Sequence, residues 1–380
     1  MIISNYQNGQ SSSLYTSDGA FSKSVNLDVF SQQGIARINY LPSAVTGTMA
    51  NLPLFASKLS TDTSNFLVSD DGNNAYLINA SAGTFSGQGS ATCGKYALSW
   101  KGYTINFTTA KPQYLATNTW TDFHGSPAFS ASSAYHYPFI SRNDGKIYIC
   151  SGRYIDMLAE TAGQDFNPAS NTTFTLTAGA FVLPEEYIAV GSAELGQYLI
   201  ISTISVCYIT GTPAQSSAPI TTYFVWDRAA TTADNIFEIP EKGLTNLVNV
   251  GNMVFCSGGD KGKIYQLTES GYQPYAQIPF DYDSGKTIQI GQAGFPSMAW
   301  WKDMLLVGVS SSDYTASVEG LNPAGIYAIK NGKIAHQFLP SEGYDGSTKK
   351  IVIGFIFVAN ETTFYFGWKN TTDSTYGIWV

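Results

Sequence analysis

The sequence is short of charge, and the charge it carries is mostly acidic. Only 13% of its 380 residues are Asp, Glu, Lys or Arg, about half the share of an average globular domain. Lys and Arg number 20 against 28 acidic residues, and no stretch is a run of basic residues. Because nucleic-acid binding depends first on a basic surface that neutralises phosphates, we expect no nucleic-acid partner.

Long apolar runs are also missing. No window approaches the roughly 18 uninterrupted apolar residues of a membrane-spanning helix. The opening residues, MIISNYQNGQSSS, lack the basic flank and apolar centre of a signal peptide. We therefore expect no membrane span.

Cysteines and histidines are few and scattered. None of the four cysteines forms a C-x-x-C pair, so neither a zinc site nor a disulfide framework is indicated. Cys150 in KIYICSG and Cys256 in MVFCSGG are expected to be small apolar strand residues. The three histidines have no metal-ligand spacing, and His136 beside a hairpin turn is expected at the surface. We predict neither a metal nor a cofactor.

Aromatic residues are abundant instead, with 24 Tyr and 22 Phe, and such residues favour strands over helices. Polar surface is supplied by Ser, Thr, Asn and Gln rather than by the Glu, Lys and Arg of solvated helix faces. Only residues 154–161, YIDMLAET, could form a helical turn, and they fit an outer strand equally well. The composition predicts an all-β protein.

A repeated unit organises the chain. Residues 243–279 read as an apolar strand, a Gly-Asn turn, MVFCS, a GDKGK turn, IYQL, a polar turn and YAQI. Four short antiparallel strands in about 37 residues are typical of one β-propeller blade. Similar units recur with first hairpin turns near residues 63, 102, 136, 196, 252, 303 and 360. The spacing of roughly 50 residues predicts a single β-propeller, most simply with seven four-stranded blades, although six or eight blades also fit.

The ends of the chain predict how the ring closes. The last unit offers only three strand candidates, IVIGFIFV, TTFYFGW and YGIWV, and an unpaired apolar edge is usually covered. We expect residues 35–40 to pair with residues 376–380 as the missing outer strand; a further strand beyond the present sequence is the alternative. Residues 1–24 are too polar for a core of their own, so we divide the chain into a polar arm, 1–24, and a propeller, 25–380. Ordering such an arm costs backbone entropy, so we expect it to lie against another subunit.

No catalytic constellation is apparent. The acidic pairs Asp70-Asp71, Asp281/Asp283 and Glu185-Glu186 fall in turns, where turn formation alone explains them. Residues 141–148, SRNDGKIY, match the S-x-[DN]-x-G-x-x-[FWY] turn called the Asp box, which recurs in sialidase propellers. The Asp box is a folding element and not a site. Sialidases bind the substrate carboxylate with three converging arginines, and this sequence contains only four arginines in all. We expect no enzyme activity.

Aromatic residues in or beside predicted loops are the candidate contact residues. Exposed aromatics can anchor a protein partner or stack on a sugar ring, although packing between blades would explain most of them. The set is Trp120, Tyr272, Tyr275, Tyr282, Trp300, Trp301 and Tyr314.

The polar opening, SLYTSDGAFSKSVNLDVFSQQGIARINYLPSAV, is followed by weak blades of the GNMVFCSGGDKGKIYQL kind. With a polar opening segment followed by such blades, the chain resembles virion-associated propeller proteins of tailed bacteriophages. The resemblance implies a structural part of the virion, in the tail or head–tail junction, which contacts other virion proteins or copies of itself. The alternative expectation is a receptor-binding module that holds host surface glycans through the loop aromatics.

Overall fold

A computed structural model describes residues 44–380, apart from 60–64, 80–81, 89–93, 118, 134, 210–211, 216–219, 281–287, 292–294, 311–323, 339–350 and 372. It also describes four two-residue strands nearer the N-terminus: β1 (Gly9–Gln10), β2 (Ala20–Phe21), β3 (Leu27–Asp28) and β4 (Arg37–Ile38). All regular elements in the described residues are strands, which confirms the predicted all-β class. No helix suited to crossing a membrane occurs in this part of the chain.

The strands from β5 onward form seven antiparallel sheets in sequence order. The first three blades consist of β5 (Pro53–Lys58), β6 (Asn65–Asp70), β7 (Ala75–Asn79) and β8 (Thr84–Gln88); β9 (Tyr96–Trp100), β10 (Tyr103–Phe107), β11 (Pro112–Ala116) and β12 (Thr119–Asp122); and β13 (Tyr137–Ile140), β14 (Ile147–Ser151), β15 (Tyr154–Glu160) and β16 (Phe174–Val182). Residues 154–160 are therefore a strand, as the second reading of YIDMLAET predicted, but not the outer one, because β15 pairs with β16 as well as with β14.

Blades 4 to 7 follow the same order. They consist of β17 (Tyr187–Leu195), β18 (Tyr198–Ile209), β20 (Thr221–Trp226) and β21 (Asn235–Ile239), with β19 (Thr212–Gln215) beside β18; β22 (Asn246–Val250), β23 (Met253–Ser257), β24 (Lys263–Thr268) and β25 (Gly271–Gln277); β27 (Met298–Trp301), β28 (Met304–Ser310), β29 (Gly325–Lys330) and β30 (Lys333–Phe338), with β26 (Gln289–Ile290) also on β28; and β31 (Ile351–Val358), β32 (Phe364–Asn370) and β33 (Thr375–Trp379).

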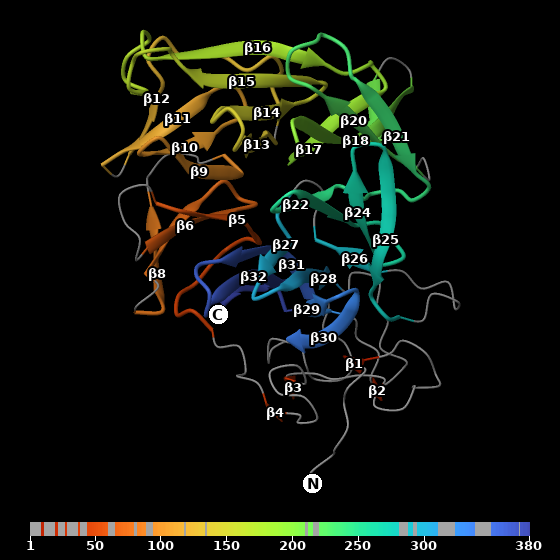
Figure 1. Cartoon of the computed structure of the whole chain (residues 1–380). Helices are drawn as coiled ribbons and strands as arrows, with labels where there is room; N and C mark the ends of the chain where they lie inside the picture. The colour runs from red at the N-terminus through yellow and green to blue at the C-terminus, as the bar shows by residue number, and fades with distance from the viewer. Residues whose placement is uncertain are drawn as a thin grey trace.

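The blades close into a ring. The first strand of each blade contacts the first strand of the next, and β31 of blade 7 returns to β5 of blade 1. Figure 1 looks nearly along the ring axis, with the first strands around the centre and the last strands at the periphery. The predicted seven-bladed propeller is confirmed. We call the face where first strands begin the start face, and the opposite one, which carries the first hairpin turns, the turn face.

Burial between neighbouring blades explains the apolar strands. All five residues of β14 are buried, and so are all seven of β28, because each has a blade on both sides. Strands buried on both faces read as continuous apolar runs. The outer strand β25, by contrast, is largely exposed. Cys150 and Cys256 are fully buried free thiols in such inner strands, as predicted.

An N-terminal segment does complete blade 7, but the predicted residues were wrong. Ala44 forms an antiparallel bridge with Trp379, and the Val45 amide donates to the Ile378 carbonyl at 2.9 Å. Within residues 35–40, Arg37–Ile38 instead pair with Leu27–Asp28. The alternation in GIARINY gave no means to tell a closing strand from one that pairs locally.

We call residues 44–49 the strap. Val45 and Met49 are 4% and 5% exposed and pack with Phe355 and Ile378 of blade 7 and with Ile78 of blade 1. The strap therefore joins the first blade to the last by apolar burial as well as by backbone pairing. Further toward the N-terminus, β1 and β3 lie beside β30 of blade 6, and β1 pairs with β2. Apart from β1 and β2, residues 1–24 lie outside the described part, so contact of the arm with another subunit stays a prediction.

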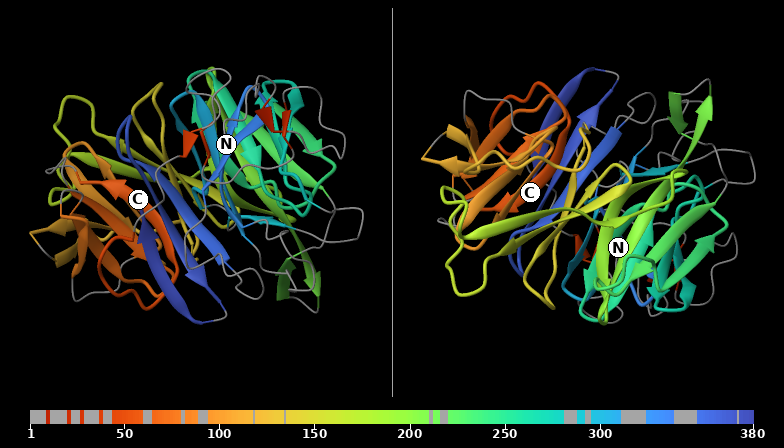
Figure 2. Two further views of the ribbon diagram at one scale, coloured as in Figure 1. Left: turned by 90° about the horizontal axis from the view of Figure 1, so that it is seen from below. Right: turned by 90° about the horizontal axis from the view of Figure 1, so that it is seen from above.

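One hairpin departs from the blade pattern. The first residue of β17, Tyr187, pairs with Ser205 of β18, yet β18 continues and pairs with β19 from Val206 to Gln215. The hairpin therefore projects beyond the start face of blade 4. In Figure 2 it is the pair of green strands that stands out from the ring.

Candidate functional site

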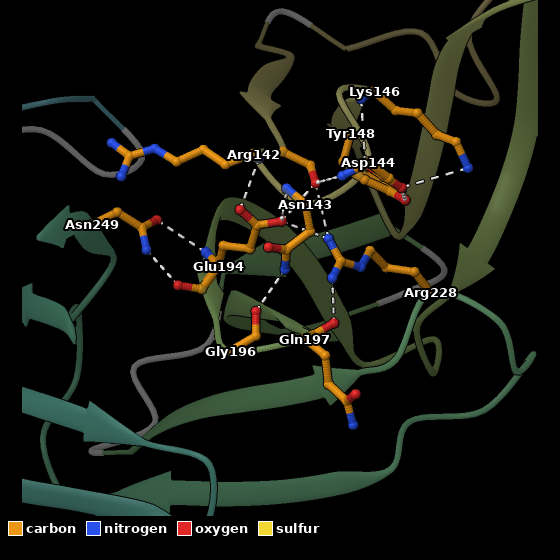
Figure 3. Close-up of polar contacts among 11 residues, drawn as sticks. Arg142, Asn143, Asp144, Lys146, Tyr148, Glu194, Gly196, Gln197, Arg228 and Asn249 are labelled. Atoms are coloured by element: carbon orange, nitrogen blue, oxygen red, sulfur yellow. Dashed lines mark hydrogen bonds and ion pairs between the residues drawn. The ribbon is translucent and has the colours of Figure 1, made fainter. Parts of the chain in front are cut away.

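A cluster of polar side chains lies on the turn face of blades 3, 4 and 5, and we call it the Glu194 cluster (Figure 3). Glu194 is the penultimate residue of β17 and is 7% exposed. Its carboxylate accepts hydrogen bonds from the Ser141 hydroxyl at 2.6 Å, the Arg142 amide at 2.9 Å and the Asn143 amide at 3.3 Å. These donors belong to the Asp-box-like turn between β13 and β14, so blade 3 caps a carboxylate of blade 4.

Arg228 completes the cluster. Its Nη1 lies 2.6 Å from Glu194 Oε1 and 2.9 Å from the Ser141 hydroxyl, and its Nη2 donates to the Gln197 carbonyl. Burial alone would raise the pKa of Glu194, but the donors from Ser141, Arg142 and Arg228 lower it below its usual value. A carboxylate so saturated with donors stays ionised and has little capacity left for a substrate.

The Glu194 backbone extends this contact to blade 5. Its amide donates to Asn249 Oδ1 at 2.9 Å, and its carbonyl accepts from Asn249 Nδ2. On the blade 3 side, the Tyr148 hydroxyl donates to Asp144 at 2.7 Å and stiffens the turn that carries Ser141. In Figure 3, the Arg142 and Gln197 side chains have no partner within the cluster, whereas the side chains of Asn143, Asp144, Tyr148, Glu194, Arg228 and Asn249 all do. The arrangement is that of a clamp between blades.

Aromatic rings occupy the centre of the propeller. Phe295 lies just before β27 of blade 6. Its ring stacks on that of Tyr96 of blade 2, with 4.8 Å between ring centroids, and meets the ring of Tyr137 of blade 3 edge-on, with 5.9 Å between centroids. Blades 2 and 3 lie opposite blade 6 in a ring of seven, so Phe295 reaches across the axis. A cavity of about 130 Å³ remains beside these rings. Burial raises the pKa of both Tyr96 and Tyr137.

A larger pocket opens on the start face where blades 6, 7 and 1 meet, and we call it the start-face pocket. It has a volume of about 290 Å³. Its wall is mainly polar and is formed by Asn51, Leu52, Asp71, Gln289, Val352, Lys369, Thr371 and Tyr376. No residue of this pocket was predicted as a site, because five separate segments of the chain supply the wall and none carries a recognisable motif.

The predicted contact aromatics do not form one surface. Trp120 is 5% exposed and packs against Leu67 and Ala97, so its prediction as a contact residue was wrong. Tyr275 and Trp300 are half-buried, and both pack against Phe255, with ring centroids 4.7 and 6.3 Å from that of Phe255.

Two further members of the set are described. Trp301 is half-buried against Phe364, whereas Tyr272 is 38% exposed. Tyr282 and Tyr314 lie outside the described residues. Tyr272 is thus the one described member of the set with an openly exposed side chain, and packing between blades explains the others.

His136 was expected at the surface and is instead 1% exposed. Its ring lies 4.3 Å from that of Phe129, and its Nε2 is 3.1 Å from the Thr109 carbonyl. The polar turn that suggested exposure begins only at Ser141, after β13, so His136 lies before the inner strand rather than in the hairpin. Burial lowers the pKa of His136. No group of three or more His, Cys, Asp or Glu in the described residues could hold a metal ion.

Comparisons with known proteins complete the description. Neither the protein-family models nor the curated proteins gave a match to this sequence. Among solved structures, the computationally designed Ika8 protein is similar with a TM-score of 0.48 and 9% sequence identity, over 88% of this chain and 99% of that one.

Proposed function

We propose that this chain is a non-enzymatic structural component of a tailed-phage virion, in the tail or head–tail junction. It acts through contacts with neighbouring virion proteins or with copies of itself. The virion setting rests on the resemblance of the sequence. The mode of action is supported by the distribution of exposed apolar side chains, which is the observation that carries the proposal.

Exposed large apolar side chains gather on three consecutive blades. In the described residues they belong to blades 3, 4 and 5, and they are Val182, Ile220, Ile236, Met253 and Tyr272. Val182 and Ile220 lie toward the start face, whereas Ile236 and Tyr272 lie toward the turn face on outer strands that contact each other. Exposed apolar side chains that adjoin on a surface are a sign of a protein contact. We call this part of the molecule the blade 3–5 side.

Outer strands form the centre of the blade 3–5 side. Ile236 on β21 is 53% exposed, and Tyr272 on β25 is 38% exposed. The two strands contact each other, and Asn235 Nδ2 reaches the Glu269 carbonyl at 3.4 Å. The β18–β19 hairpin of the same blade projects from the start face, at the opposite end of the blade from Ile236, so the exposed apolar side chains of the outer strands carry the proposed contact without the hairpin.

The test is the double variant Ile236→Ser, Tyr272→Ser. Both side chains are exposed, so folding should be unaffected, while association of the purified protein and its incorporation into particles should fall. Light scattering after size exclusion and quantitation of the chain in purified particles measure the two effects. Thr119→Ser on β12, the outer strand of blade 2, is the matched control. Normal incorporation of the double variant would contradict the proposal.

A receptor-binding module for host glycans is the second candidate. The loop aromatics give it little support, because only Tyr272 among those described is openly exposed. The polar start-face pocket supports it better, at a different place from the one predicted. Strong binding to a glycan array that Tyr272→Ser leaves unchanged would favour the pocket over the loop aromatics.

A further inference from the structure

The start-face pocket has polar walls that are held in place without any ligand. Asn51 donates through Nδ2 to Asp70 at 3.2 Å, and Asp70 is itself fully buried. Two amides of the following turn, Gly72 and Asn74, also donate to Asp70 at 2.9 and 2.8 Å. The Asn51 side chain is therefore positioned in advance, as effective binding sites require.

A buried lysine fixes the acidic group of the pocket. Lys95 is 8% exposed, and its Nζ lies 3.1 Å from Asp71 Oδ1 and also donates to the Asp71 carbonyl. The Asp71 side chain remains 46% exposed. One face of this carboxylate is thus neutralised within the protein, and the carboxylate still reaches the pocket as a hydrogen-bond acceptor.

Lys369 supplies the opposite charge. Its Nζ lies 5.2 Å from the centre of the Tyr376 ring, and its half-buried side chain forms no ion pair with another described residue. Because Lys369 lies over the Tyr376 ring, that ring face is covered and does not offer a stacking surface. The ammonium instead provides a site for an anion.

These groups select a chemical class of ligand. Lys369 favours a carboxylate, while Asn51, Gln289 and Asp71 offer donors and acceptors suited to hydroxyl groups. A doubly charged phosphate spreads its charge over several oxygens, so the exposed Asp71 carboxylate would repel it. A ligand with a single carboxylate can turn that group toward Lys369 and keep it away from Asp71. The volume of about 290 Å³ is just below the roughly 300–1,000 Å³ of small-molecule pockets, which suits a ligand of one ring.

We propose that the start-face pocket binds a carboxylate-bearing sugar, with the carboxylate on Lys369 and the sugar hydroxyls on Asn51, Asp71 and Gln289. The site is one sugar ring in size, as in a hexuronic acid. It is independent of the blade 3–5 side and of the aromatic residues predicted from the sequence.

The experiment compares three probes on the full chain by ligand-observed NMR titration: glucuronate, glucose and inorganic phosphate. Glucuronate should bind, glucose at least about tenfold more weakly, and phosphate more weakly than glucuronate, since a charge-assisted hydrogen bond contributes about a factor of ten or more. Equal binding of glucose, tighter binding of phosphate or no binding of glucuronate would each overturn the proposal.

Two variants locate the ligand. Lys369→Gln should weaken glucuronate binding at least about tenfold and make it similar to that of glucose. Lys302→Gln is the matched control, because Lys302 also lies over an aromatic ring, that of Trp301 at 4.4 Å, but on the turn face. Thermal unfolding verifies that both variants fold. Unchanged affinity in Lys369→Gln overturns the assignment, and glucuronate binding retained by Ile236→Ser, Tyr272→Ser separates this site from the proposed assembly function.

Discussion

The seam between blades 7 and 1 and the seam between blades 3 and 4 are joined by different chemistry. At the first, the strap inserts Val45 and Met49 between the two blades and adds backbone bonds to Ile378 and Gly83 at 2.9 and 2.7 Å. At the second, the Glu194 carboxylate of blade 4, paired with Arg228 of the same blade, accepts hydrogen bonds from the Ser141 hydroxyl and the Arg142 amide of blade 3 at 2.6 and 2.9 Å, and these bonds supplement the apolar packing.

The difference follows from what each seam must accomplish. Blades 7 and 1 are at opposite ends of the sequence, so nothing but tertiary contact brings them together, and apolar burial supplies that attraction without precise geometry. Blades 3 and 4 are adjacent in the chain and need only a defined relative position. A buried charged carboxylate contributes little net stability, but its hydrogen bonds from the Ser141 turn require a defined geometry between the two blades.

Removal of the strap should have the largest effect. Deleting residues 1–49 loses the burial of Val45 and Met49, each contributing about 1.5–3 kcal/mol, and exposes the edge of β33 to other chains. We expect a loss of about 3–6 kcal/mol in the free energy of unfolding, with aggregation measurable by light scattering. Deletion of residues 1–43, which keeps the strap, is the control. A soluble monomer with an unchanged melting temperature after the longer deletion would refute the role of the strap.

Glu194→Ala should be nearly as damaging at the other seam. It leaves Arg228, whose side chain is 10% exposed, without its carboxylate, together with the Ser141 hydroxyl and two turn amides. Loss of one partner of a buried pair costs about 3–5 kcal/mol. Denaturant unfolding of Glu194→Ala and of the native protein measures this loss of unfolding free energy. Adding Arg228→Ala should recover part of the loss, and a double variant as unstable as the sum of both single variants would show that the two groups are not coupled.

The two seams should differ in their response to acid. The folded state lowers the pKa of Glu194 below the ordinary value of 4.5, so its ionised form stabilises the protein above that value, and this contribution disappears as the pH falls through the lower folded pKa. The strap contributes no ionisable side chain. Unfolding free energies between pH 7 and pH 3 should therefore fall less in Glu194→Gln than in the native protein, and parallel curves would exclude this contribution.

The smallest effect is expected for a second ion pair near the same seam. Arg153 Nη1 lies 3.3 Å from Glu185 Oε1, but the Glu185 side chain is 79% exposed. Exposed pairs contribute about 0–1 kcal/mol, so Glu185→Ala should barely change the denaturation midpoint. If Glu185→Ala lost as much unfolding free energy as Glu194→Ala, burial would not explain the difference in stability expected between the two ion pairs.

Much of the fold could be predicted because each blade is encoded locally. The turns expected near residues 102, 196, 252 and 303 lie between the first two strands of their blades, where Gly-Asn and Lys-Asp pairs interrupt apolar runs. The turn expected near residue 136 was placed too early, since the first hairpin turn of blade 3 follows Ile140. A histidine flanked by tyrosines suggested a turn, although it packs on Phe129 in the core.

The contact residues could not be read in the same way. Trp120 and Tyr272 both occur beside polar turns. Trp120 is nevertheless buried against Leu67 of blade 1, whereas Tyr272 is exposed on the outer strand β25. The difference depends on which blade face each side chain meets, and a strand's own sequence does not specify its neighbour.

Alternation of apolar and polar residues, interrupted by turn residues, was sufficient by itself to determine that this chain forms strands, hairpins and repeated blades, because those preferences act within a few residues. The identity of the closing segment and the position of the start-face pocket were decided only by the tertiary structure. Ala44 meets Trp379, and Lys369 shares a pocket with Asn51, after the ring has brought together residues more than 300 positions apart. Contacts over such separations leave no local pattern in the sequence, because many different segments could satisfy the same apolar edge or line the same pocket.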